Sequence, residues 1–172
     1  MKTLKLTNWS LMIIAAIMLT GCGFKLRSGQ ALPAGYNQIY LSGTQDFSPL
    51  KRSMEEYLNR YEIPFVLSEP QTHPYSTVAI YLMPDTLDRR LLSLYPTGQV
   101  AEYELVLSIR YQVIFPGKEA QFIEFDVTRE YQDDPDAILA KSRELELVLS
   151  ELRQQAADRI IRMLPSQGSS NL

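Results

Sequence analysis

A long stretch of alternating residues, from Val100 to Phe115, constrains the fold of this chain more than any other feature. Every second residue from Ala101 to Phe115 is apolar or aromatic, and most of the residues between them are polar. Successive side chains of a β-strand point to opposite faces, so the pattern predicts a strand of about 15 residues, against about 5 to 6 for an average strand. A turn at Pro116 to Glu119 and renewed alternation from Ile123 to Thr128 predict a long antiparallel hairpin with one face on a core.

Two helices and two shorter strands are predicted around this hairpin. Residues 37–41 and 76–83 have strand-like composition, and Ser48 followed by Pro49 is typical of the start of a helix, here reaching residue 61. A second helix is predicted to start at Asp134 and Pro135 and to stop at Pro165, a length of about 45 Å. We therefore expect an α+β fold, a two-layer sandwich with two helices packed on one face of a four-stranded, mostly antiparallel sheet.

The N-terminus has the pattern of a bacterial lipoprotein signal. Lys2 and Lys5 precede an apolar run of about nine residues, which is too short to be a permanent membrane span. Leu19-Thr20-Gly21-Cys22 follows and resembles a lipobox. We expect residues 1–21 to be a signal peptide, residues 22–166 to form one domain anchored by lipid at Cys22, and residues 167–172 to be a flexible tail. The alternative is an ordinary secretory signal with an incidental cysteine.

The residue after Cys22 bears on the destination of the protein. It is glycine, Gly23, and not the aspartate that marks retention at the inner membrane in many enteric bacteria. This points to the outer membrane, with the domain facing the periplasm. Two or more acyl chains on one cysteine would hold such a domain stably on the membrane.

The composition disfavours several classes of function. The chain has 17 basic and 20 acidic residues, whereas a general nucleic-acid binder usually carries a basic balance. The single histidine, His73, is flanked by proline in a predicted loop, and no motif for phosphate, cofactor or metal binding is present. Asp133 and Asp134 are better explained as acidic residues at a helix start than as a catalytic pair. We therefore expect a non-enzyme without cofactor or metal.

Four strings resemble motifs of the LptE family of lipopolysaccharide (LPS)-assembly lipoproteins, in the order of that family. They are Gly21–Arg27 (GCGFKLR), Gly98–Leu105 (GQVAEYEL), Val113–Lys118 (VIFPGK) and Asp134–Lys141 (DPDAILAK). The resemblance spans essentially the whole mature chain. It implies a partner protein that sits as a plug, one-to-one, inside the outer-membrane β-barrel LptD, supports assembly of the barrel and binds LPS.

The resemblance also implies site residues. The basic residue at the end of the fourth string is Lys141, which is the first candidate for a contact with an LPS phosphate. A second basic residue of the family precedes the second string, but Pro96 occupies that place here, so Arg89 and Arg90 are candidates to replace it. The strand tips at Tyr95 and at Pro116 and Gly117, together with Phe24 and Leu26 after the anchor, are the candidate contacts with the barrel.

Two other classes of function remain open at this stage. The first is a free, periplasm-facing lipoprotein that binds a small amphiphile or a cell-wall glycan. The second is an unrecognised hydrolase that uses Glu102 and Glu104, which lie two apart on one face of the predicted strand.

Overall fold

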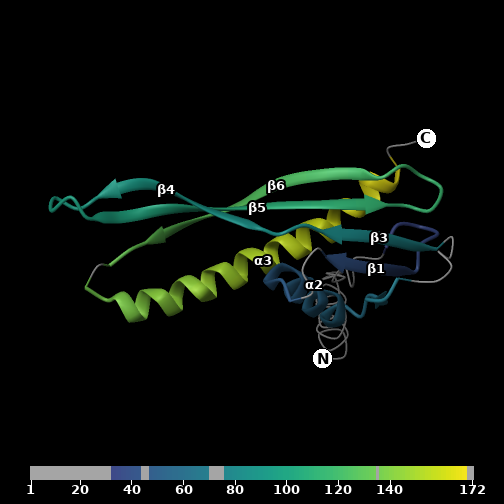
Figure 1. Cartoon of the computed structure of the whole chain (residues 1–172), viewed down its shortest axis with the longest axis horizontal. Helices are drawn as coiled ribbons and strands as arrows, with labels where there is room; N and C mark the ends of the chain where they lie inside the picture. Colours follow the sequence, from purple (N-terminus) through teal and green to yellow (C-terminus); the bar gives the residue numbers. More distant parts are fainter. Residues whose placement is uncertain (1–31, 44–46, 70–75, 135, 170–172) are drawn as a thin grey trace, which may run out of the picture.

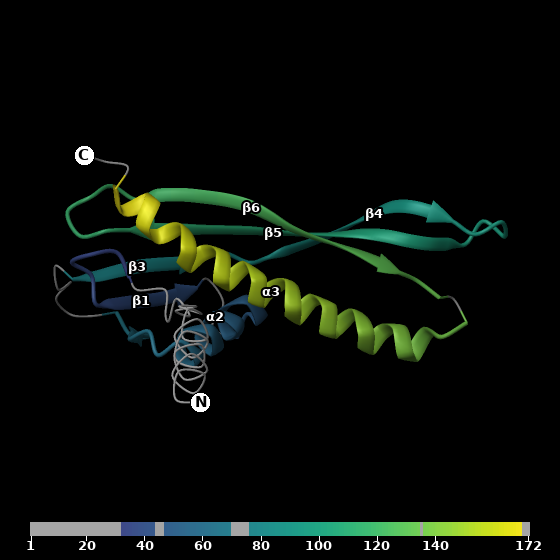
Figure 2. The same cartoon turned by 180° about the vertical axis from the view of Figure 1, so that it is seen from behind.

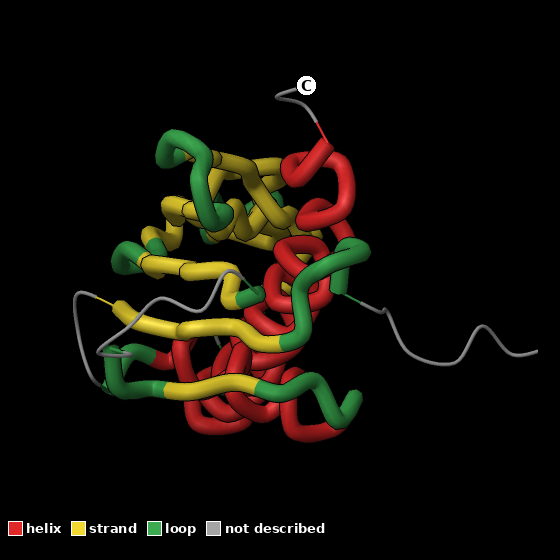
Figure 3. Tube along the Cα trace, turned by 90° about the vertical axis from the view of Figure 1, so that its right-hand side faces the viewer, coloured by secondary structure: helices red, strands yellow, loops and turns green. Residues whose placement is uncertain are grey.

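The computed structural model describes residues 32–43, 47–69, 76–134 and 136–169. Two helices lie on one face of a six-stranded sheet (Figure 1). Viewed along the long axis, the strands form one layer and the helices the other (Figure 3). No helix in the described part of the chain is both long and apolar enough to cross a membrane. The predicted α+β arrangement of two helices on a sheet is confirmed.

The elements follow one another as strand β1 (Gln38–Gly43), helix α2 (Pro49–Arg60), strands β2 (Phe65–Val66), β3 (Thr77–Leu82), β4 (Thr86–Leu94), β5 (Val100–Ile114) and β6 (Gln121–Gln132), and helix α3 (Ile138–Ser169). The predicted N-cap of α2 is present, because the Ser48 hydroxyl oxygen accepts a hydrogen bond of 3.1 Å from the Lys51 backbone N–H. A cap of this kind satisfies one of the backbone donors that a helix N-terminus leaves without an intrahelical partner.

The sheet differs from the predicted four-stranded, mostly antiparallel sheet. It has six strands, and β1 pairs in parallel with both β2 and β3, so the sheet is mixed. β5 is the long strand that joins the two halves: β3 pairs with its last residues and β4 with most of the rest, while β6 lies along its other side. The two strands that were not predicted give no periodic signal, since β2 has only two residues and β4 is largely exposed on both faces.

The predicted hairpin of residues 100–128 is confirmed and is longer than expected. β5 and β6 pair from Glu102 with Gln132 to Val113 with Gln121. One face of the sheet and the helices enclose a single core, which includes residues of β1, β3 and β5 and, from the helices, Leu50, Met54, Leu58, Leu152, Ala156, Ile160 and Leu164. The core-facing residues of β5 recur at every second position, as its alternating sequence predicts.

Helix α3 runs diagonally across the sheet (Figure 2) and begins and ends later than predicted. It begins at Ile138, because Asp134 forms a turn in which its side chain accepts a hydrogen bond of 3.0 Å from the Asp136 N–H. It continues through Pro165 to Ser169, so the predicted stop at Pro165 is wrong. Two side chains near the β5–β6 turn bind the end of the helix: Lys118 of the turn donates to the Gly168 carbonyl, and Gln121 at the start of β6 donates to the Gln167 carbonyl.

The molecule is elongated because two segments extend beyond the packed body. The β4–β5 hairpin and the first turns of α3 reach away from α2, β1 and β3 (Figures 1 and 2). Burial follows the same division, because Leu152, Ala156 and Ile160 of α3 are fully buried, whereas Ile138 and Leu139 are 69% and 83% exposed. The candidate site lies at this extended end.

Candidate functional site: an amphipathic pocket at the hairpin end

A pocket of about 400 Å³ lies where the extended hairpin meets the start of α3. It is lined by side chains from β4, β6, the β6–α3 connection and α3: Arg89, Tyr131, Asp133, Asp134, Ile138, Lys141, Ser142 and Leu145. Two cations, two carboxylates and three apolar or aromatic side chains therefore share one concave surface.

The local backbone brings these side chains together. On the sheet, Leu91, Tyr103 and Tyr131 pair across β4, β5 and β6, so they point to the same face. On α3, the lining residues stand at positions 138, 141, 142 and 145, a spacing that places side chains on one side of a helix. The core-facing side of the hairpin and one side of the helix thus form opposite walls.

Lys141 is held in a defined position on the helix wall. Its ammonium nitrogen lies 2.9 Å from Glu144 Oε2 and 5.3 Å from the centre of the Tyr131 ring. The Tyr131 hydroxyl donates a hydrogen bond of 2.8 Å to the Lys141 carbonyl, so strand and helix are tied at this residue. The hydrogen bond to Glu144 raises the pKa of Lys141 above its ordinary value. The side chain is therefore cationic throughout the neutral range, as an ordinary lysine also is.

The structure separates the two arginines that the sequence left as equivalent candidates. Arg89 pairs with Leu105 and lies on the pocket side of the sheet, where it joins Lys141. Arg90 pairs with Glu104 on the opposite face, and its guanidinium makes an ion pair of 3.2 Å with that carboxylate. Only Arg89 lines the pocket with Lys141.

The acids of the pocket are fixed by the backbone. Asp133 Oδ1 accepts a hydrogen bond of 3.0 Å from the Asp134 N–H, and Asp134 Oδ1 accepts one of 3.0 Å from the Asp136 N–H. These two residues form the turn before α3 and do not cap the helix itself. Each carboxylate therefore has one oxygen engaged by a backbone N–H group of this turn, whereas the acid that pairs with Lys141 is Glu144.

The arrangement suits an amphiphilic ligand. Arg89 and Lys141 supply charged donors, and a guanidinium and an ammonium are the side chains that bind phosphates in proteins. Tyr131, Ile138 and Leu145 supply an apolar wall beside them. Exposed apolar side chains continue along the end of β4 at Leu91, Leu92, Leu94 and Tyr95, which are 55%, 49%, 53% and 39% exposed.

The candidate barrel contacts lie far apart. Tyr95 stands at the β4–β5 end beside the pocket, where its hydroxyl donates a hydrogen bond of 3.2 Å to the Asp133 carbonyl. Pro116 and Gly117 lie in the β5–β6 turn at the other end of the long hairpin, next to the end of α3 (Figure 1). Cys22, Phe24 and Leu26 lie outside the described residues.

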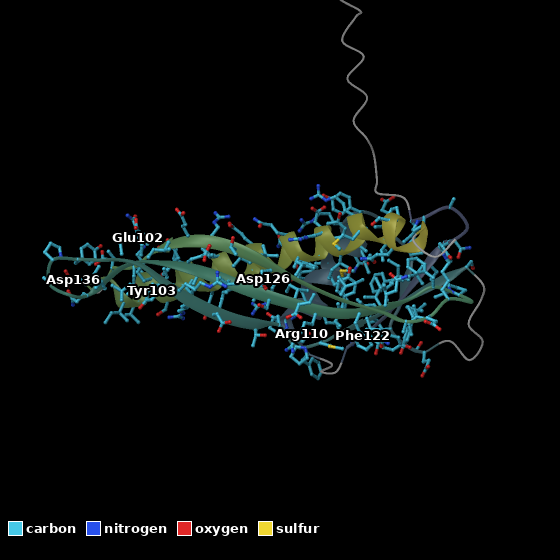
Figure 4. The ribbon with its side chains drawn as sticks, turned by 90° about the horizontal axis from the view of Figure 1, so that it is seen from above. Glu102, Tyr103, Arg110, Phe122, Asp126 and Asp136 are labelled. Atoms are coloured by element: carbon cyan, nitrogen blue, oxygen red, sulfur yellow. The ribbon has the colours of Figure 1, made fainter. Side chains whose placement is uncertain are left out.

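Glu102 and Glu104, the candidate carboxylate pair of a hydrolase, each contact a different side chain of β4. Glu102 accepts a hydrogen bond of 2.8 Å from the Ser93 hydroxyl, and Glu104 pairs with Arg90. Both lie on the outer face of the hairpin, which also includes Arg110 and Asp126 (Figure 4). Within the described ranges no three His, Cys, Asp or Glu side chains are grouped so that they could hold a metal ion, and His73 lies outside those ranges.

Sequence reasoning did not assign six of the lining residues to a site: Tyr131, Asp133, Asp134, Ile138, Ser142 and Leu145. It also missed their neighbour Glu144. Tyr131 continues the alternation of Ile123, Phe125 and Val127, so extending that pattern by four residues would have found it. Ile138 and Leu145 are apolar residues seven positions apart in the second predicted helix, a spacing that predicts core residues on one face. Glu144 carries no signal in the sequence, since its importance depends on its contact with Lys141.

Comparison with known proteins agrees with the fold and the motifs. A family model described as LptE, lipopolysaccharide-assembly, matches residues 36–164. The LPS-assembly lipoprotein LptE of Pectobacterium atrosepticum is 31% identical over 88% of this chain and 80% of its own, and that of Yersinia enterocolitica is 30% identical over 88% and 72%.

Solved structures extend this likeness to the backbone. The crystal structure of rare lipoprotein B from Shewanella oneidensis has a TM-score of 0.66 and 42% identity, over 77% of this chain and 96% of that one. A solution structure of lipoprotein B from Nitrosomonas europaea, 23% identical with a TM-score of 0.65 over 87% and 95%, shares the fold. The chain therefore belongs to the LptE family of LPS-assembly lipoproteins, whose members are not enzymes.

Proposed function

We propose that this chain is an outer-membrane lipoprotein, anchored at Cys22, that plugs the LptD β-barrel one-to-one, supports its assembly and binds LPS as it is inserted into the outer leaflet. Membership of an LPS-assembly family supports the process. The lipobox and the glycine after Cys22 support the anchor and its membrane.

One observation carries the LPS-binding part of this proposal. The pocket places Arg89 of β4 and Lys141 of α3 around one space, although 52 positions (141 − 89) separate them in the sequence. LPS carries phosphates next to acyl chains, and here two cations stand next to Ile138, Leu145 and the exposed end of β4. Neither helix nor hairpin alone would form such a site.

The shape and surface of the extended end support the role as a plug. The outer face of the sheet carries Glu102 and Glu104 at the extended end, and Arg110 and Asp126 nearer the middle of the molecule (Figure 4). This polar face is suited to the polar lumen of an outer-membrane barrel. Apolar side chains exposed at the end of β4, by contrast, are suited to a less polar part of a partner or a ligand. The elongated body places the end of β4 and the start of β5 well away from α2 (Figure 1).

The two adjacent arginines provide a matched test of the site. Full-length protein in a non-ionic detergent is titrated with purified LPS, and the dissociation constants of Arg89→Gln, Lys141→Gln and Arg90→Gln are compared with that of the unaltered chain. We expect the first two variants to bind about 3-fold to 10-fold more weakly, as for the loss of one charge-assisted contact. Arg90→Gln lies on the other face and should leave the affinity unchanged.

Two results would contradict the proposed LPS site. One is that all three variants bind LPS as tightly as the unaltered chain does. The other is that Arg89→Gln and Arg90→Gln lose affinity equally, which would indicate a general effect of net charge. Binding of small amphiphiles but not of LPS, by a protein that remains monomeric in membrane extracts, would favour the free periplasm-facing lipoprotein instead. Depletion of the protein from cells tests the assembly role, since it should leave LptD misassembled and LPS in the periplasm.

A further inference from the structure

We propose that Glu144 sets the affinity of the pocket for anionic amphiphiles, by competing with the ligand for the Lys141 ammonium. The inference rests on the proposed function of the pocket, and it adds a residue that controls how strongly that pocket binds. Glu144 is not one of the lining residues. It stands one turn further along α3 and reaches the site only through Lys141.

The contact between the two side chains makes competition possible. Glu144 Oε2 lies 2.9 Å from Lys141 Nζ, within the range of a charge-assisted hydrogen bond. The Lys141 side chain is 20% exposed and the Glu144 side chain is 49% exposed, so the carboxylate is the outer partner of the pair. A phosphate that binds Lys141 from solvent therefore meets this carboxylate at the rim of the pocket.

Lys141 contacts Tyr131 as well as Glu144, whereas the Glu144 side chain pairs with Lys141 alone among the described residues. The Tyr131 ring lies under the ammonium, and the Tyr131 hydroxyl binds the Lys141 carbonyl. Within the described part of the chain, the hydrogen bond to Lys141 is the only one that the Glu144 side chain makes. Rotation about the side-chain bonds of Glu144 would release the ammonium without any movement of the backbone.

Glu144 differs in this respect from the other acids near the site. Asp133 and Asp134 each bind a backbone N–H in the turn before α3, so a ligand cannot displace them without disturbing the turn. The negative charges of Asp133 and Asp134 balance the positive charges of Arg89 and Lys141, the two cations that line the pocket. The carboxylate of Glu144 makes the site acidic by one charge, and its displacement restores the balance.

The test removes the negative charge of Glu144 and compares the effect on LPS affinity with that of removing the charge of a nearby acid on the same helix. Glu146 is exposed on the same helix and does not line the pocket, so Glu146→Gln changes the net charge equally without touching Lys141. Full-length Glu144→Gln, Glu146→Gln, Lys141→Gln and Lys141→Gln/Glu144→Gln proteins in non-ionic detergent are titrated with purified LPS and with dephosphorylated LPS, at low and high salt.

The expected result is specific to the phosphates and to Lys141. Glu144→Gln should bind LPS about 3-fold to 10-fold more tightly at low salt, with a smaller gain at high salt because salt screens exposed charges. Glu146→Gln should bind as the unaltered chain does. Dephosphorylated LPS should show no gain, and the gain should vanish when Lys141 is already glutamine.

Failure of this inference is distinguishable from failure of the proposed function. If Lys141→Gln weakens binding but Glu144→Gln leaves it unchanged or weakens it too, the competition is refuted and the LPS site stands. An equal gain in Glu144→Gln and Glu146→Gln would refute it as well, since any acid of the helix would then act alike. If Lys141→Gln binds LPS as the unaltered chain does, the proposed site itself is wrong.

Discussion

At the scale of single residues, hydrogen bonds between distant elements fix the two ends of α3. Tyr131 holds the first turns through the Lys141 carbonyl. At the other end, the Gln167 amide donates a hydrogen bond of 2.8 Å to the Tyr111 hydroxyl, and both side chains are buried. This bond explains how a polar residue near the end of the helix is accommodated at the edge of the core, since a buried polar group needs a partner.

Replacement of the Tyr111 hydroxyl tests this bond. Tyr111→Phe keeps the ring and removes the hydroxyl that accepts this hydrogen bond, so the free energy of unfolding should fall by about 0.5 to 1.5 kcal/mol. Urea denaturation of the full-length protein measures it. Tyr103→Phe is the control, because the Tyr103 hydroxyl makes no hydrogen bond in the described part of the chain. Equal stability of both variants and the unaltered chain would contradict a stabilising role for this bond.

At the scale of elements, α3 consists of two parts with different environments. Its second half contributes Leu152, Ala156 and Ile160 to the core, whereas Leu147 in its first half is 67% exposed. The second half therefore stabilises the fold, and the first half is available for binding. Burial of one half of a helix and exposure of the other is the pattern expected when one half stabilises the fold and the other presents a binding surface.

A pair of alanine substitutions tests this division. Ile160→Ala creates a cavity in a fully buried site, so the free energy of unfolding should fall by about 2 to 5 kcal/mol. Leu147→Ala removes an exposed side chain and should change it by no more than about 0.5 kcal/mol. Chemical denaturation of both variants is the measurement. A large loss of stability in Leu147→Ala would show that the first half of α3 is also part of the folding core.

The same elements show what sequence reasoning can reach. The long hairpin and both helices were predicted because their periods of two and of about 3.6 residues persist over many positions. β2 and β4 were not, since two residues carry no period and β4 has little burial to impose one. The sequence predicts that the helix stops at Pro165, but contacts from Lys118 and Gln121 hold the helix beyond it. A contact between residues that are distant in the chain has no local sequence signal.

The candidate site was predictable to a similar degree. The resemblance to the family motifs made Lys141 a candidate, and Arg89 and Arg90 were candidates to replace the basic residue that is missing at Pro96. The choice between the two arginines depends on the register of β4 with β5, which the sequence does not reveal. Glu144 and Tyr131 entered the site only through their contacts with Lys141. Residues that act through a neighbour are found from the structure.

At the scale of the whole molecule, buried phenols set a limit on stability in alkali. Burial raises the pKa of Tyr57, Tyr111 and Tyr131 above the ordinary value of 10.0. In the unfolded chain these phenols ionise near pH 10, before they do so in the folded protein, so ionisation favours unfolding. Their contribution is fully present below about pH 10 and is lost as the pH rises through the raised pKa values.

The raised pKa values of these tyrosines predict how the free energy of unfolding depends on pH. These phenols should leave it unchanged from pH 7 to about pH 9.5 and lower it progressively above about pH 10. Tyrosinate absorbance, followed together with circular dichroism, measures ionisation and unfolding in one titration. Ionisation of every tyrosine at its ordinary pKa, with no coupled loss of structure, would contradict the account.

The extended end carries the pocket between hairpin and α3, exposed leucines and a polar outer face, which are the surfaces that the proposed complex requires. The measurement that tests this most directly is purification of the tagged full-length protein from outer membranes in a mild detergent, with quantitative mass spectrometry of what remains bound. The account predicts the LptD barrel in near one-to-one amount. Recovery of the lipoprotein alone would contradict it.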